Sequence, residues 1–252
     1  MSAVIVIPAR YDSTRFPGKP LALLNGKPLI QHVYENSQGA VLAEDVIVAT
    51  DSETIFETVL SFGGKAVMTS RSHLSGTDRV SEVARLVDYD IIVNVQGDEP
   101  LIKPQVIDDV ISILADADAD VGTMVKRIGE PEEILDPNVV KVVFGEDGFA
   151  LYFSRAPIPY HRDGWRGVNL CEVKPSAFTV YKHIGIYSYR RDALLRLTEI
   201  KPTKLEQVEK LEQLRALEHG FRIKVKEMSL EIIGVDTPQD LERVERWLSL
   251  SS

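Results

Sequence analysis

The stretch Pro8-Ala-Arg-Tyr-Asp-Ser-Thr-Arg-Phe-Pro-Gly-Lys-Pro-Leu21 follows directly on the apolar run Ala3-Val-Ile-Val-Ile7, and this junction decides the fold. A short, unbroken apolar run is typical of a strand buried in a parallel sheet. The stretch after it places three cations, Arg10, Arg15 and Lys19, in one loop. In an open α/β sheet, the loop at the carboxyl end of the first strand is a common ligand site. Arginine offers paired donors and lysine a compact charge, so the loop suits a polyphosphate, although a solvated basic loop without function is the alternative.

This loop matches neither of the two common phosphate-binding motifs. The Walker pattern fails because Gly18-Lys19 is followed by Pro20 and no glycine lies five residues before Gly18. The dinucleotide fingerprint G-x-G-x-x-G is also absent after this strand. The sequence therefore indicates a phosphate site of a different kind.

The 252-residue chain has an ordinary globular composition, with 44% hydrophobic and 27% charged residues, and its length fits one large α/β domain, alone or with a smaller appendage. The net charge of −9 argues against a nucleic-acid partner, because a phosphate backbone needs a basic surface, whereas a small anionic substrate needs only a local positive field. Cys171 is the only cysteine, so no intramolecular disulfide can form and a reducing compartment is expected. Because the sequence has no membrane-length apolar run and no signal peptide, we expect a cytoplasmic protein with no membrane partner.

Apolar patterns in the first half of the chain alternate between strand-like and helix-like. Short apolar runs separated by amphipathic segments predict parallel strands joined by right-handed helical crossovers. The predicted fold class is therefore α/β, with an open, doubly wound, mostly parallel sheet of the Rossmann-like kind. The expected strands cover residues 3–7, 45–50, 65–68 and 90–95, and helices are expected near 28–34, 55–60, 80–87 and 104–114.

This alternation stops near residue 122 and resumes near 191. Residues of about 122–190 therefore form a predicted smaller, mixed α/β lobe and a candidate subunit contact, while 1–121 and about 191–252 form the core. The elements expected in the lobe are hairpin strands at 139–144 and 149–155, an irregular stretch at 156–176 and a strand at 178–190.

The last quarter of the chain predicts a long helix from about 202 to 220. Glu212 falls on the apolar arc of this helix, so its carboxylate needs a ligand or a partner such as Arg155. Thr237-Pro-Gln-Asp240 has the form of a capping box with proline at the first helical position, and it predicts a final helix. The arc consists of Leu205, Val208, Leu211, Leu214 and Leu217, and strands are expected at 223–225 and 232–235.

Two aspartates stand at the ends of apolar runs, Asp98 in Val95-Gln-Gly-Asp-Glu-Pro100 and Asp236 in Val235-Asp-Thr-Pro238. Strand ends on one edge of a sheet converge, and two carboxylates beside a polyphosphate loop would repel each other without a cation between them. Mg²⁺ prefers such hard oxygen ligands and is commonly held by one or two carboxylates and substrate phosphates. The sequence therefore predicts a magnesium site at Asp98 and Asp236. Taken singly, Asp236 could only support a helix N-terminus and Asp98 could only be a turn residue.

Two further segments have plain structural interpretations. Ser75, Thr77 or Asp78 can cap the helix that follows them. His183, alone on a predicted strand, is typical of a structural histidine. Neither segment indicates a ligand by its pattern alone.

Seven motifs distributed over nearly the whole chain resemble those of the cytidylyltransferases that activate acidic sugars, and most closely the 3-deoxy-manno-octulosonate (Kdo) cytidylyltransferases. The motifs are P-A-R-Y-D-S-T-R-F-P-G-K-P-L, S-G-T-D-R, Q-G-D-E-P, S-R-A-P-I-P, H-I-G-I-Y, L-E-Q-L-R and G-V-D-T-P. The resemblance implies a nucleotidyltransferase fold and a Mg²⁺-dependent transferase. Its reaction would move CMP from CTP to Kdo, releasing pyrophosphate, for lipopolysaccharide biosynthesis. It also implies a homodimer.

The resemblance assigns roles to individual residues. The middle lobe would contribute to the sugar pocket, and the catalytic residues would be Arg10, Arg15, Lys19, Asp98 and Asp236, the last two binding the metal. The nucleotide would contact Pro8, Ala9, Arg10, Ser13, Arg15, Lys19, Ser75, Gly76, Thr77, Gln96 and Asp98. The sugar acid would contact Gln96, Arg155, His183, Tyr187, Glu212 and Gln213.

Two alternatives to this function stay open from the sequence. The first is the same reaction on sialic acid or on 8-amino-Kdo, since one changed hydroxyl contact would suffice. The second is a sensor that binds CTP without turnover. Both Asp98 and Asp236 are present, which disfavours the sensor because a sensor needs no metal placed for chemistry.

Overall fold

The structure is a computed structural model that describes residues 1–12, 16–163, 165, 179–230 and 233–250. Outside these ranges lie Ser13, Thr14, Arg15 and Cys171, the rest of 166–176 within the predicted irregular stretch, and the first residue of each of the predicted strands 178–190 and 232–235. Within them, every helix is too short or too polar to cross a lipid bilayer.

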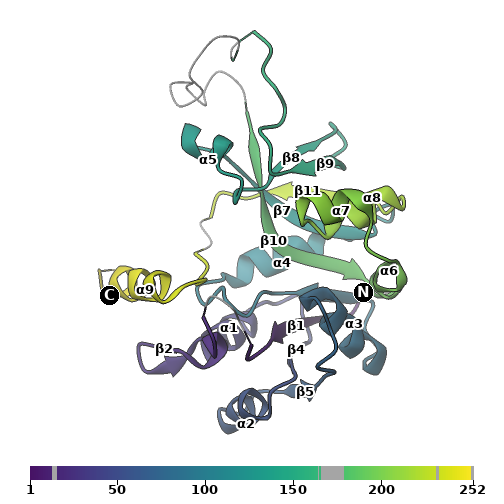
Figure 1. Ribbon diagram of the computed structural model, residues 1–252. Coiled ribbons are helices and arrows are strands. Elements are labelled where there is room, and N and C mark those ends of the chain that lie inside the picture. Colours follow the sequence, from purple (N-terminus) through teal and green to yellow (C-terminus); the bar gives the residue numbers. More distant parts are fainter. Residues whose placement is uncertain (13–15, 164, 166–178, 231–232, 251–252) are drawn as a thin grey trace.

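One large sheet forms the centre of the molecule (Figure 1). Among the described residues it has nine strands, and its main path runs β11-β7-β10-β6-β1-β4-β5. The pairs β1–β4, β1–β6, β4–β5 and β11–β7 are parallel, whereas β10 runs antiparallel to both of its neighbours on the path. The strands are β1 (Ala3–Ala9), β4 (Asp45–Thr50), β5 (Ala66–Met68), β6 (Ile91–Asn94), β7 (Val121–Arg127), β10 (Tyr181–Arg190) and β11 (Ile223–Glu227).

Helices cover both faces of the sheet, as the doubly wound prediction requires. Side chains of β1 alternate between the faces: Ile5 and Ile7 join the core beneath α1, α2 and α4, and Val4 and Val6 join the core beneath α3 and α6. All four of these side chains are fully buried, which explains why the run is apolar without alternation. The helices are α1 (Leu29–Ser37), α2 (Glu53–Ser61), α3 (Gly76–Leu86), α4 (Pro104–Ile113) and α6 (Arg191–Glu199).

A smaller group of elements lies beyond the main path of the sheet, at the top of Figure 1. It contains α5 (Pro131–Leu135) and the predicted hairpin, which is observed as β8 (Lys141–Phe144) and β9 (Ala150–Ser154). β8 pairs with the first residues of β10, so this group is continuous with the main sheet. β7 and β10 fall within the range expected for a smaller lobe, yet both are inner strands of the main path. The boundaries of such a lobe stay a prediction.

The predicted helix over 202–220 is wrong. The structure has two short helices, α7 (Lys204–Glu209) and α8 (Gln213–Glu218), separated by Lys210 in the left-handed region with φ of 55°. The break turns Leu211 into the core, while Val208 remains 82% exposed. The expected apolar arc therefore does not exist as one surface.

The C-terminal segment agrees with one prediction and contradicts another. Residues 233–235 form no strand; Val235 is buried, and its backbone N–H donates to the carbonyl of Asp98 at 2.8 Å. The capping box is confirmed, because Thr237 and Asp240 exchange side-chain and backbone hydrogen bonds at the start of α9 (Pro238–Leu250). α9 packs through Val244 on the segment that holds η1 (Lys19–Leu21), β2 (Leu23–Leu24) and β3 (Lys27–Pro28).

Candidate active site

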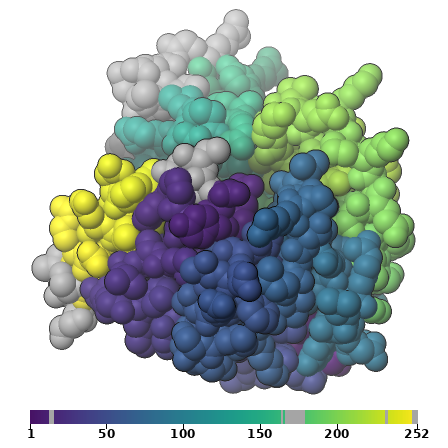
Figure 2. All heavy atoms as spheres, turned by 60° about the horizontal axis from the view of Figure 1, so that its bottom comes forward, coloured from purple at the N-terminus to yellow at the C-terminus, as the bar shows by residue number. Residues whose placement is uncertain are grey.

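A cavity of about 390 Å³ opens at the carboxyl ends of β1 and β6. From β1 the chain proceeds to β4 and β5 on one side and returns to β6 on the other, so this is the topological switch point of the sheet. Figure 2 shows the N-terminal segment in purple on one face, between the yellow C-terminal helix and blue segments. The cavity is lined by Pro8, Ala9, Arg10, Lys19, Pro20, His73, Leu74, Ser75, Gly76, Arg79, Gln96, Gly97, Asp98, Glu212 and Asp236.

The two strand ends approach each other closely at Gly97. A Cβ atom added there would lie 3.0 Å from the carbonyl oxygen of Pro8, which real side chains rarely tolerate. Because glycine has no Cβ atom, the segment after β6 can lie directly against the end of β1, and both line the cavity there.

The basic loop contributes Arg10 and Lys19 to the cavity. Its turn depends on Gly18, which has φ of 69° and donates its backbone N–H to the carbonyl of Tyr11 at 3.0 Å. Pro20 at the start of the short helix η1 then fixes the direction in which Lys19 leaves the turn. The third cation of the loop, Arg15, lies outside the described residues.

Asp98 and Asp236 meet at one point of the cavity, as their positions at the ends of apolar runs predicted. The Nζ atom of Lys19 lies 2.6 Å from Oδ2 of Asp98 and 3.2 Å from Oδ1 of Asp236. The described residues contain no group of three or more His, Cys, Asp or Glu side chains with metal-site geometry. Two carboxylates that converge on one cation at the edge of this cavity still fit Mg²⁺, whose remaining ligands are commonly water and substrate phosphates.

Glu99, next to Asp98, is a buried acid that the sequence analysis did not single out. Its Oε2 has no hydrogen-bond partner among the described residues. Burial, with a smaller contribution from the Asp98 carboxylate, raises the pKa of Glu99 to about 8. The only feature of the sequence that could have drawn attention to Glu99 is its place as a second acidic residue, between Asp98 and Pro100.

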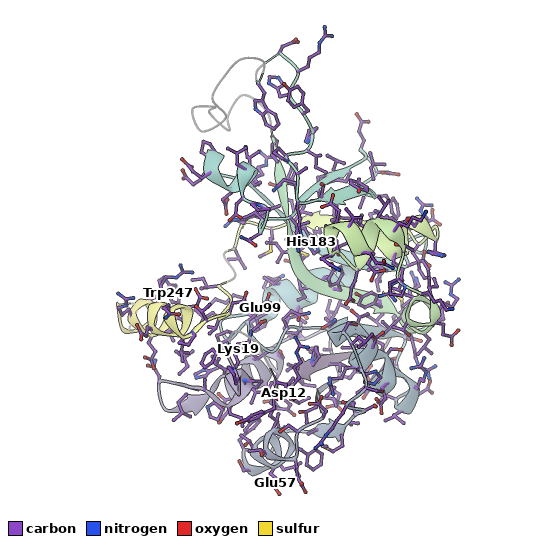
Figure 3. The ribbon with its side chains drawn as sticks, viewed as in Figure 1. Asp12, Lys19, Glu57, Glu99, His183 and Trp247 are labelled. Carbon is purple, nitrogen blue, oxygen red and sulfur yellow. The ribbon has the colours of Figure 1, made fainter. Side chains whose placement is uncertain are left out.

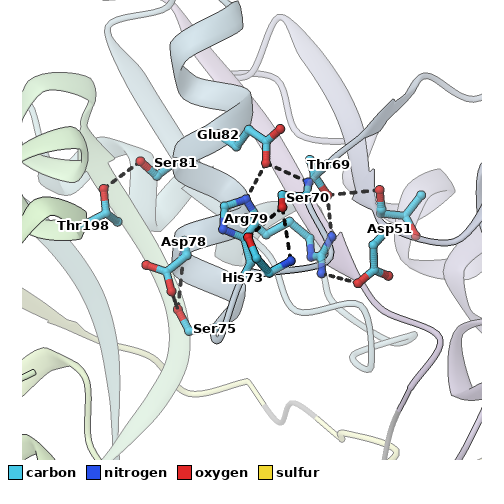
Figure 4. Close-up of polar contacts among 12 residues, drawn as sticks. Asp51, Thr69, Ser70, His73, Ser75, Asp78, Arg79, Ser81, Glu82 and Thr198 are labelled. Carbon is cyan, nitrogen blue, oxygen red and sulfur yellow. Dashed lines mark hydrogen bonds and ion pairs between the residues drawn. The ribbon is translucent and has the colours of Figure 1, made fainter.

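The loop before α3 also lines the cavity, and its polar contacts are drawn in Figure 4. Ser75 caps α3, because its Oγ accepts a hydrogen bond from the backbone N–H of Asp78 at 3.1 Å, so the capping interpretation is confirmed. Ser75 and Gly76 also line the cavity, whereas Thr77 lines a neighbouring hollow. A capping role and a ligand-facing position are therefore combined in this segment.

Arg79 connects the start of α3 to the ends of two sheet strands. Its guanidinium is buried and lies 2.7 Å from Oδ2 of Asp51, which follows β4, and it also donates to Thr69 after β5. Sequence reasoning missed Arg79 as a site residue. A signal existed, since Arg79 lies one turn before Val83 on the buried face of α3 and a buried arginine needs anionic partners.

Glu82 makes a second set of contacts that holds the same loop, at Ser70 and His73. Glu82 accepts the backbone N–H of Ser70 at 2.9 Å and makes a close contact with Nε2 of His73. The hydrogen bond from Ser70 lowers the pKa of Glu82, His73 adds to this effect, and burial opposes it. His73 and Arg79 both line the cavity, so both sets of contacts support the same wall of it.

The residues assigned to the sugar acid are distributed over several places. Gln96 and Glu212 line the main cavity. Glu212 also borders a small hollow of about 30 Å³ lined by Tyr187 and Gln213, so these two residues adjoin the main cavity through it. The side chain of Arg155 instead donates to the backbone carbonyls of Glu209 at 2.6 Å and Pro137 at 2.7 Å.

Glu212 reaches the cavity for a reason other than the one the sequence suggested. Leu205 lies on α7 and Glu212 at the N-terminal end of α8, so they never share one helical arc. Glu212 is half-exposed at the start of α8, where a carboxylate is favoured by the helix dipole.

His183 lies on β10, above Lys19 and Glu99 in the view of Figure 3. Its Nε2 is 3.0 Å from the hydroxyl of Thr123, and its ring packs edge-on against Phe153 with centroids 5.2 Å apart. Burial lowers the pKa of His183 to about 4 and raises the pKa of the neighbouring Tyr187. His183 therefore has the surroundings of a structural histidine, and it lines a hollow of about 380 Å³ beside β8.

Comparison with known proteins identifies the family. The profile of the cytidylyltransferase family matches residues 4–227. A 3-deoxy-manno-octulosonate cytidylyltransferase of Geobacter metallireducens is 54% identical, with 99% of this chain and 98% of that protein covered. One of Pelobacter propionicus is 51% identical over the full length of both chains.

Solved structures agree. A CMP:2-keto-3-deoxy-manno-octonic acid synthetase in complex with CTP has a TM-score of 0.92 at 42% identity, with both chains fully covered. A 4-diphosphocytidyl-2C-methyl-D-erythritol synthase of Anaerococcus prevotii, 11% identical with a TM-score of 0.63 and 98% of both chains covered, shares the fold. Asp236 lies beyond the region that the family profile matches, but within the part aligned with the full-length relatives. The chain belongs to the 3-deoxy-manno-octulosonate cytidylyltransferase family.

Proposed function

We propose that this protein transfers CMP from CTP to Kdo and releases pyrophosphate. The observation that carries the proposal is the meeting of Lys19, Asp98 and Asp236 at the switch-point cavity of a chain from this family. The cavity offers a cationic wall for phosphates and a carboxylate pair for a metal ion. We also propose, as expected above, that the protein is cytoplasmic and that its product, CMP-Kdo, is used in lipopolysaccharide biosynthesis.

In this reaction the anomeric hydroxyl oxygen of Kdo bonds to the α-phosphorus of CTP. The bond from that phosphorus to the bridging oxygen breaks, pyrophosphate leaves with the electron pair, and the hydroxyl proton passes to solvent. Arg10, Lys19 and the undescribed Arg15 would hold the phosphates in line and oppose their negative charge. Asp98 and Asp236 would hold Mg²⁺, which supplies Lewis-acid stabilisation of the phosphate charge.

The two substrates would bind to different parts of the chain. The nucleotide would occupy the cavity between the basic loop and the wall formed by Ser75 and Gly76. The sugar acid would extend from Gln96 toward Glu212, with Tyr187 and Gln213 behind it. For Arg155 and His183 we propose a shaping role for the sugar side, since Arg155 fixes the backbone at Pro137 and Glu209.

The direct test is pyrophosphate release from each of the four nucleoside triphosphates, with Kdo, sialic acid, 8-amino-Kdo or no sugar. We expect release from CTP with Kdo, with the other pairings at least about tenfold slower. Faster turnover of sialic acid or 8-amino-Kdo would establish the alternative substrate. Tight CTP binding without release for any sugar would establish the sensor.

The metal assignment has its own test. Asp98→Asn and Asp236→Asn should each lower turnover by about a hundredfold or more at saturating Mg²⁺, because losing a carboxylate ligand removes several kcal/mol of charge stabilisation. Asp45→Asn is the matched control: Asp45 also pairs with a lysine, Lys65, at 2.7 Å, and neither residue lines the cavity. Near-normal turnover of either cavity variant removes that aspartate from the site.

A further inference from the structure

The position between Asp98 and Asp236 is filled by a side chain of the protein itself. Nζ of Lys19 lies 2.6 Å from one carboxylate and 3.2 Å from the other, and the Lys19 side chain is only 13% exposed. The two aspartates are more open, at 31% and 48% exposure. All three side chains line the cavity, and the ammonium of Lys19 is the least exposed of the three.

The carboxylate pair does not depend on Lys19 for its assembly. The carbonyl of Asp98 accepts the backbone N–H of Val235 at 2.8 Å, which ties the two segments together one residue before Asp236. The Thr237–Asp240 capping box and the packing of Val244 against Leu24 and Leu29 then fix the start of α9. Backbone contacts therefore hold the two carboxylates together while the long Lys19 side chain is free to change partner.

An ammonium and a divalent ion cannot share this position. Mg²⁺ binds carboxylate oxygens at about 2.0–2.1 Å with near-octahedral geometry, so the oxygens that now contact Nζ would have to turn to the metal. Two cations at contact distance would also repel each other strongly. A triphosphate in the cavity changes this balance, because it offers the ammonium of Lys19 new anionic partners within reach of the same loop.

We propose that Lys19 is a displaceable internal cation that occupies the metal position of the Asp98–Asp236 pair until the triphosphate draws its ammonium away. The inference rests on the proposed function, because it takes that pair as the metal site. It makes metal and nucleotide binding cooperative: each ligand favours the arrangement in which Lys19 has left the carboxylates. The free enzyme would then bind divalent metal weakly, and metal would enter together with the nucleotide.

The test measures Mn²⁺ binding to the nucleotide-free protein by electron paramagnetic resonance, which counts free Mn²⁺ directly. Lys19→Met keeps an unbranched side chain without the charge, and we expect it to bind Mn²⁺ about 5- to 150-fold more tightly than the wild type, the range typical of coupling between sites. Lys27→Met is the matched control; Lys27 lies in the same segment and pairs with Glu35 at 2.8 Å on the surface, so its Mn²⁺ binding should not change. Unchanged or weaker binding by Lys19→Met would overturn the proposal.

Two further arms separate displacement from simpler explanations. Adding Asp98→Asn to Lys19→Met should abolish the gain, and a gain that persists places the metal elsewhere and contradicts the proposal. With saturating CTP the advantage of Lys19→Met should vanish, because the nucleotide has already moved the ammonium in the wild type. An equal advantage with and without CTP would mean only that a nearby positive charge was removed.

A thermal-melting series covers the case in which the carboxylate pair destabilises the Lys19→Met variant. Mn²⁺ should raise the melting temperature of Lys19→Met more than that of the wild type, and equal shifts would count against displacement. These outcomes are independent of pyrophosphate release. If the wild type converts CTP and Kdo but Lys19→Met binds Mn²⁺ no more tightly, only the inference is refuted. If the wild type is inactive but Lys19→Met does bind Mn²⁺ more tightly, only the proposed function is refuted.

Discussion

His183 shows how burial of a single side chain links stability to pH. Its pKa is lowered by burial to about 4 in the folded protein, against 6.5 for an exposed histidine. Between these values the unfolded chain binds more protons, so the free energy of unfolding falls as pH decreases from about 6.5 to 4, in total by about 3 kcal/mol. Above pH 6.5 this contribution is fully present.

His183→Gln keeps a polar group beside Thr123 and removes this titration. Urea unfolding of the wild type and the variant between pH 7 and pH 5 should therefore show a smaller loss of stability for the variant. His219→Gln, at an exposed histidine on the end of α8, is the control and should follow the wild type. Parallel stability curves for wild type and His183→Gln would contradict a largely enclosed, neutral His183.

Residue-level predictions from the sequence succeeded where the side chain serves its own local backbone. Ser75 and Thr237 are caps that act within three residues, and local pattern suffices to find them. Asp98 and Asp236 were placed together because both follow apolar runs. Arg79 and Glu99 escaped because their roles depend on burial by segments distant in sequence, which a local pattern does not encode.

The loop before α3 provides a prediction at the level of elements. Asp51 does not line the cavity, yet it holds Arg79, which does line it, and on the proposed function this wall faces the nucleotide. Asp51→Asn should lower stability by about 1 to 3 kcal/mol and raise the KM for CTP, with kcat and the KM for Kdo changed little. Steady-state kinetics with each substrate varied in turn measures this split.

The matched control for this element is again the Asp45–Lys65 pair, 2.7 Å apart, in which the lysine side chain is 65% exposed to solvent. Asp45→Asn should stay within about 0.5 kcal/mol of wild-type stability and should not alter the KM for CTP. If Asp51→Asn lowers kcat and leaves the KM for CTP unchanged, the Asp51–Arg79 pair acts on catalysis and not on nucleotide binding.

Elements were predictable where apolar period and length agreed, as in β1, α3 and α4. The break at Lys210 was not, since the apolar spacing continues across it and lysine rarely adopts a positive φ. Across the turn Glu206 and Arg215, both buried, pair at 3.2 Å, and this contact between the two short helices is not encoded in the apolar spacing. The antiparallel direction of β10 could not be predicted either, because the residues of a strand do not show which strands it pairs with or in which direction.

At the level of the whole molecule we predict a homodimer formed through the middle part of the chain. The family resemblance implies a homodimer, two-fold dimers are the commonest oligomers, and β9 leaves Leu151 67% exposed. Light scattering at micromolar protein should give twice the chain mass. Leu151→Asp should shift the equilibrium toward the monomer, whereas Leu86→Asp, at an exposed leucine on the end of α3, should not. If light scattering gives the mass of a single chain for the wild type, the homodimer prediction is wrong.

The three-layer architecture was predictable because the alternation of strands and helices fixes parallel pairing and covers both faces of the sheet. The position of the cavity followed from the same rule, which places ligands at the carboxyl ends of the strands. The way β7, β10 and β11 extend the sheet beyond β6 did not follow, because each of these pairings joins strands separated by long intervening segments.

The measurement that tests the central claim most directly is ³¹P nuclear magnetic resonance of the protein with CTP, Kdo and Mg²⁺. The account predicts that the three CTP resonances are replaced by one phosphodiester resonance and by pyrophosphate, in equal molar amounts, and only when Kdo is present. Unchanged CTP, or release of orthophosphate without a phosphodiester, would contradict it.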